Sequence, residues 1–105
     1  MNLGNVTGID LVTFGTGKTW SAVNTVSTSA QTVSVPGVRL GDMILVTKPT
    51  EQTGVSVTGA RVSAADTVTV IFSNPTAGNL TPTAEEEYSA VVLRSSLPLN
   101  DAVTI

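Results

Sequence analysis

Short runs of β-branched residues, separated by turn-forming residues, recur along this chain and favour β-structure throughout. Threonine, valine and serine together supply 43 of the 105 residues. β-branched side chains are restricted about χ1 and fit a pleated, half-buried surface better than a helix. The runs recur at the spacing typical of a sandwich or a barrel. We therefore expect one all-β domain, an antiparallel β-sandwich or barrel of the jelly-roll type.

The pattern predicts six strands after residue 18 and a further short one at the C-terminus. Their expected ranges are Thr19–Val26, Gln31–Val35, Met43–Lys48, Val55–Val62, Thr67–Ser73, Tyr88–Ser95 and Ala102–Ile105. Val68, Val70 and Phe72 alternate with other residues, which predicts that they face the core together. Met43–Val46 is apolar throughout, which predicts a central strand buried on both faces.

The first 18 residues have a different composition and predict an extended N-terminal arm. They hold four glycines among Asn and Thr and only short apolar runs. Glycine costs entropy to order, so such a segment is expected to lie outside the core. The predicted division is an arm at 1–18 and a β-sandwich domain at 19–105. The apolar residues of the arm are the expected partner contacts: Leu3, Val6, Ile9 and Leu11.

Charge is low and scattered along the chain. Five basic and eight acidic side chains give a net charge of −3, and the basic residues are never adjacent. This distribution argues against nucleic acid, whose binding requires clustered Lys and Arg. Charged residues make up 12% of the chain, about half the usual share. We therefore expect a partner to cover part of the neutral surface, and copies of the chain to associate.

The residue inventory lacks the side chains of most catalytic sites. There is no histidine and no cysteine, which removes the commonest general base, the commonest zinc ligand and disulfides. No stretch has the spacing of a calcium loop. We expect no enzyme activity, cofactor, metal or small-molecule substrate. The sequence begins without signal-peptide features and has no apolar stretch approaching ~18 residues, so neither secretion nor a membrane is expected.

The sequence Gly15–Thr19, GTGKT, ends like a phosphate-binding loop. The first glycine of that motif would fall at Val12, and the residues that follow are poor helix formers. A phosphate-binding loop needs both the glycine and a helix behind it. A glycine turn leading into a strand is the better interpretation.

A long connection from Asn74 to Glu87 ends in three glutamates. Glu85, Glu86 and Glu87 are expected to form a solvated loop end, with pairing to a basic patch on a partner as the alternative. Asp42 and Asp66 stand where strands begin and are expected to cap turns.

Trp20 is the only tryptophan in the chain. It is interpreted as a core anchor or a partner contact. The alternative is a stacking platform for a sugar ring.

Three segments within residues 31–95 resemble small virion proteins of tailed bacteriophages. They are SVPGVRLGDMILVTKP, GVSVTGARVSAADTVTVIFSNPTAG and EYSAVVLR. Sequences with this succession of strands and turns are similar to head-decoration (cement) and head-fibre proteins, and to β-domains of other phage appendages.

The resemblance implies a protein without catalytic residues that is made in the host cytoplasm and resides on the capsid exterior. Such a protein binds the major capsid protein and stabilises the head, usually as a homotrimer. The alternative is a receptor- or glycan-binding β-domain of a phage fibre, tail or baseplate, which would show an exposed aromatic cluster.

Overall fold

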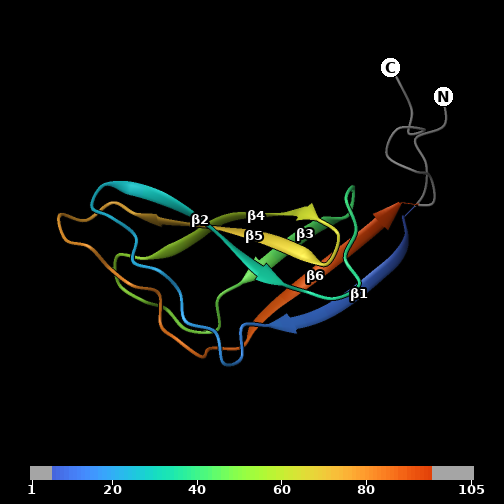
Figure 1. Ribbon diagram of the computed structural model, residues 1–105, viewed down its shortest axis with the longest axis horizontal. Helices are drawn as coiled ribbons and strands as arrows, with labels where there is room; N and C mark the ends of the chain where they lie inside the picture. The colour runs from blue at the N-terminus through green and yellow to red at the C-terminus, as the bar shows by residue number, and fades with distance from the viewer. Residues whose placement is uncertain (1–5, 96–105) are drawn as a thin grey trace, which may run out of the picture.

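The computed structural model describes residues 6–95 and contains six strands in two sheets (Figure 1). The strands are β1 (Val6–Phe14), β2 (Ser27–Ser34), β3 (Met43–Thr47), β4 (Ser56–Ala64), β5 (Thr67–Asn74) and β6 (Tyr88–Ser95). The first sheet has the order β1-β6-β3 and the second β2-β5-β4, and every pairing is antiparallel. No helix occurs between residues 6 and 95. The all-β prediction is confirmed.

The two central strands, β5 and β6, supply the middle of the core. Val68, Val70 and Phe72 of β5 are 0% exposed, as their alternation predicted. Tyr88, Ala90 and Val92 of β6 are also buried. Because successive side chains of a strand point to opposite faces, these residues define the inner faces of the two sheets.

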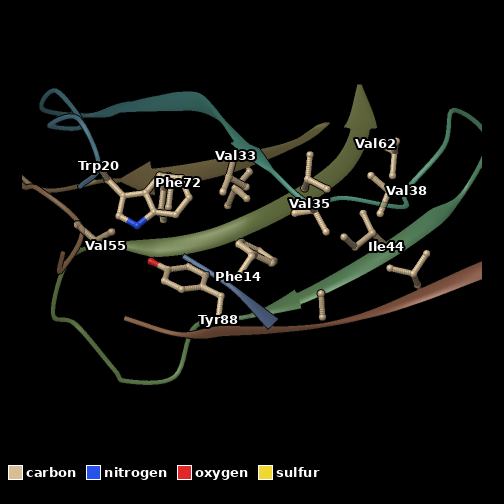
Figure 2. Packing of buried hydrophobic residues seen from close by; sticks show 14 of the residues in the cluster. Phe14, Trp20, Val33, Val35, Val38, Ile44, Val55, Val62, Phe72 and Tyr88 are labelled. Carbon is tan, nitrogen blue, oxygen red and sulfur yellow. The ribbon is translucent and has the colours of Figure 1, made fainter. Parts of the chain in front are cut away.

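Four aromatic rings gather at one end of the core (Figure 2). Trp20 packs on Phe72 with ring centroids 4.9 Å apart and on Tyr88 at 5.5 Å, and Phe14 lies 5.7 Å from Tyr88. Tilted and edge-to-face pairs of this kind contribute about 0.5–1.5 kcal/mol each beyond burial. The cluster joins both sheets, since Phe72 belongs to β5 and Tyr88 to β6.

The predicted arm at residues 1–18 is wrong for residues 6–14. This segment is β1, which pairs with β6 from Val6↔Ser95 to Phe14↔Tyr88. Phe14 is 7% exposed and Val12 packs against the core, so burial offsets the entropic cost of the glycine in the strand. The domain therefore begins at β1 rather than at residue 19, whereas residues 1–5 lie outside the described part.

The segment predicted as a strand at Thr19–Val26 is irregular. It keeps one isolated bridge, in which the backbone of Val23 pairs with that of Leu80. Its order comes from burial instead, because Trp20 and Val23 are 5% and 0% exposed. The short strand predicted at Ala102–Ile105 lies outside the described residues.

β3 is an edge strand, so the prediction of a central strand buried on both faces is wrong. Ile44 is 7% exposed, but Met43 and Leu45 are 67% and 70% exposed. The reason is the layer structure: the first sheet packs on the second with one face only, and no third layer of residues 6–95 covers the other.

Aspartates hold the turns at the end of the sandwich opposite the aromatic cluster. Asp42 accepts a hydrogen bond from the Arg39 amide at 3.0 Å, as predicted, and pairs with Arg94 at 2.6 Å. The hydrogen bond from Arg94 holds the pKa of Asp42 below its ordinary value. Asp66 lies in the turn between β4 and β5 but caps the turn at Gly37, because its carboxylate accepts a hydrogen bond from the Gly37 amide at 2.8 Å.

Candidate functional site

The outer face of the β1-β6-β3 sheet is apolar over most of its area. The strand register arranges nine side chains there in three rows: Ile9–Leu93–Met43, Leu11–Val91–Leu45 and Thr13–Ser89–Thr47. The alternate residues of the same strands, such as Ile44 and Val92, are buried in the core. We call the first two rows the apolar face.

The apolar face is open to solvent in the described structure. Six large apolar side chains among residues 8–94 are exposed, and four of them lie here: Ile9 at 71%, Leu11 at 77%, Met43 at 67% and Leu45 at 70%. Val91 and Leu93 are half-buried between them on the central strand. Contiguous exposed apolar patches usually mark sites of protein or membrane interaction. A cluster of this kind differs from apolar residues scattered singly over a surface.

Sequence reasoning found part of this surface. Ile9 and Leu11 were expected partner contacts, and both lie on the apolar face, although in a strand rather than in an arm. Met43 and Leu45 were missed because β3 was expected in the middle of a sheet. The available signal was the apolar character of both faces of β6, where Tyr88 to Leu93 carry more apolar residues than one core requires.

Of three other predicted contact residues, the structure describes the side chain of Trp20 alone. Leu3 and the side chain of Val6 lie outside the described residues. Trp20 is 5% exposed within the aromatic cluster, so its ring offers almost no surface to a partner. The packing of Trp20 matches its interpretation as a core anchor.

Glu86 belongs to an internal ion pair, which corrects the expectation of three solvated glutamates. Its Oε1 lies 2.7 Å from Lys48 Nζ, and the two side chains are only 8% and 10% exposed. The Thr50 hydroxyl donates to the other carboxylate oxygen. The hydrogen bonds from Lys48 and Thr50 lower the pKa of Glu86. Glu85 and Glu87 are exposed, as expected.

A cavity of about 310 Å³ lies beside this ion pair, between the end of β3 and the start of β4. Its lining is mostly aliphatic and hydroxyl-bearing: Val46, Thr47, Lys48, Thr50, Glu51, Gln52, Val55, Ser56 and Val57. Glu51 is the one carboxylate in this lining, so the cavity offers no pair of acids for general acid–base chemistry. No group of three or more possible metal ligands occurs among the residues that the structure describes.

The aromatic side chains are unavailable as a binding platform. The chain has two phenylalanines, one tryptophan and one tyrosine, and all four are buried, none above 7% exposed. A sugar ring or a base that stacked on an aromatic face would therefore find none at the surface.

Within residues 6–95, no helix is long and apolar enough to cross a lipid bilayer. Comparisons with protein-family models, with curated proteins and with solved structures found no match to this chain. The resemblance to phage virion proteins therefore stays a prediction.

Proposed function

We propose that this chain is a capsid decoration protein of a tailed bacteriophage. It binds the outer surface of the shell of major capsid protein and stabilises the head. The observation that carries the proposal is the apolar face, which suits a chain that functions within a protein assembly such as a decorated head. The bacteriophage assignment itself comes from the resemblance of residues 31–95.

A structural role also fits the chemistry of the described surface. The chain lacks histidine and cysteine. Among the described residues, the Asp42–Arg94 ion pair ties a loop to β6, and the Glu86–Lys48 ion pair ties two loops together. Charged groups that pair with each other in this way stabilise the fold and are poorly placed to take part in catalysis. The proposed assembly is a homotrimer on the capsid exterior, formed from chains made in the host cytoplasm.

The alternative, a receptor- or glycan-binding domain of a fibre, tail or baseplate, lacks a supporting observation. It would use exposed aromatic rings, and the four rings of this chain lie in the core. Exposed Glu85 and Glu87 suit a basic patch on a protein partner better than a neutral sugar.

Sedimentation with empty shells tests the proposal. Shells are assembled from the major capsid protein encoded in the same genome, mixed with the purified chain and pelleted. The chain is expected to pellet at a saturable ratio and to raise the temperature at which the shells break. An unrelated β-sandwich of similar size serves as the control and should stay in the supernatant.

Two results would contradict the proposal. A chain that stays in the supernatant with the control does not bind the shell. A chain that binds to a glycan array and not to shells supports the receptor-binding alternative instead.

A further inference from the structure

We infer that the apolar face is the surface through which copies of this chain contact one another. The inference rests on the proposed function for its biological setting, and it names the occupant of a surface that the function leaves open. The charge, the area and the strand edges of the face support it.

The charge distribution favours a second copy over a different partner. None of the nine side chains in the three rows is charged. Asp10 lies between Ile9 and Leu11 in β1, so the alternation of the strand directs it to the opposite face. A face without charge offers no electrostatic selection of a foreign protein, whereas it meets its own copy without like-charge repulsion. Charged residues are likewise depleted at the centre of interfaces between identical subunits.

The area of the face matches the lower limit of a specific interface. The four exposed side chains Ile9, Leu11, Met43 and Leu45 present on the order of 100 Å² of apolar surface each. With the half-buried pair on β6 and the Thr/Ser row, one copy would bury roughly 500–600 Å², and two faces together about 1,000–1,200 Å². A biological contact should clear about 1,000 Å². A second copy that covers the whole face therefore reaches the required area, whereas a short peptide on part of it would not.

The edge of β1 also favours a closed assembly of copies. Among the described strands, β1 pairs with β6 alone, so its other edge has unpaired backbone groups. An uncovered edge next to an apolar face is an aggregation hazard. Closed cyclic symmetry covers such surfaces without forming fibres. In the proposed trimer each face is divided between two neighbours around the axis, so the number three comes from the resemblance, whereas the area of the face supports contact between copies.

Light scattering coupled to size exclusion, at micromolar concentration, tests the inference with matched variants. Leu45→Lys and Leu11→Lys place a charge on the face from either edge strand. Leu40→Lys is the control, because Leu40 is as exposed as Leu45, 68% against 70%, but lies in the turn between β2 and β3. The wild type and the control are expected near 32 kDa, three times the chain mass of 10.7 kDa. The two face variants are expected near 10.7 kDa, with circular dichroism unchanged.

The outcomes separate this inference from the proposed function. A monomeric wild type would overturn the inference, as would face variants that stay associated. A mass near twice that of the chain, lost in the face variants, would support the contact and contradict the trimer. Shell binding is scored independently: an associated chain that does not pellet with shells keeps this inference and overturns the decoration role. A monomer that pellets unless Leu45 is replaced would assign the face to the shell and overturn the inference.

Discussion

Tyr88 shows how one side chain reports on the packing of the core. Its ring contacts Phe14, Trp20 and Phe72, and its hydroxyl is buried without a hydrogen-bond partner among residues 6–95. Burial, with a smaller contribution from the negative charge of Glu86, raises the pKa of Tyr88 from 10.0 to about 12. The folded state therefore favours the neutral phenol.

Tyr88 is the only tyrosine, so near-ultraviolet absorbance can follow its ionisation alone. We expect the folded protein to titrate near pH 12 and the chain in denaturant near pH 10. Because the folded pKa is raised, the stability linked to this group is complete below pH 10 and is lost as the pH rises toward 12. Ionisation near pH 10 in the folded protein would show that the hydroxyl reaches solvent and that the aromatic cluster is open.

At the scale of elements, two glycine turns allow the effect of backbone conformation on stability to be distinguished from the effect of steric crowding. Gly15 follows β1 with φ +97°, and Gly37 lies between β2 and β3 with φ +99°. A Cβ added at Gly15 would lie 2.7 Å from the Glu86 carbonyl oxygen, whereas one added at Gly37 would meet nothing within 4 Å. A residue with Cβ would therefore have the same unfavourable backbone conformation at both positions, but it would be crowded at Gly15 alone.

Alanine at each position should measure the two effects by urea unfolding. Gly37→Ala is expected to lower the free energy of unfolding by about 1–2 kcal/mol, the cost of a left-handed conformation for a residue with Cβ. Gly15→Ala should cost a further 1–3 kcal/mol or so, because the backbone of the β5–β6 loop must move. Equal losses would mean that this loop is not packed against Gly15 as described.

The elements that the sequence predicted well are those with a local signal. The alternation of Val68, Val70 and Phe72 specified both a strand and its buried face. The turns around Gly37 and Asp42 were readable from residue type. β1 was not, because the glycines in and around it resemble those of an arm and its stability comes from pairing with β6, 74 to 89 residues later in the chain. Sequence pattern does not report such distant pairing.

Because sequence pattern does not report distant strand pairing, only part of the candidate site could be predicted. The low charge of the chain predicted association, and the apolar character of both faces of β6 was visible in the sequence. The position of β3 at an edge follows from the strand order, which has no local signal, so Met43 and Leu45 were placed in the core. Trp20 could be a platform or an anchor until the packing of the aromatic cluster was known.

The whole molecule has two layers of three strands, and only one face of each layer meets the other. The outer face of β2-β5-β4 is largely polar, with Thr28, Thr32 and Arg61 exposed, whereas that of β1-β6-β3 is apolar. This asymmetry gives the domain one surface suited to water and one suited to protein. A decoration protein that associates through the apolar face would keep its hydroxyl-rich sheet turned outward.

Electron cryomicroscopy of intact particles tests the central claim most directly, since it locates the chain on the virion. The predicted result is density for this domain on the outside of the head, in groups of three at threefold or quasi-threefold positions. Within each group the β1-β6-β3 sheets should turn toward the axis. Density for the domain on a tail, fibre or baseplate, or none on the particle, would contradict the proposal that this chain decorates the capsid.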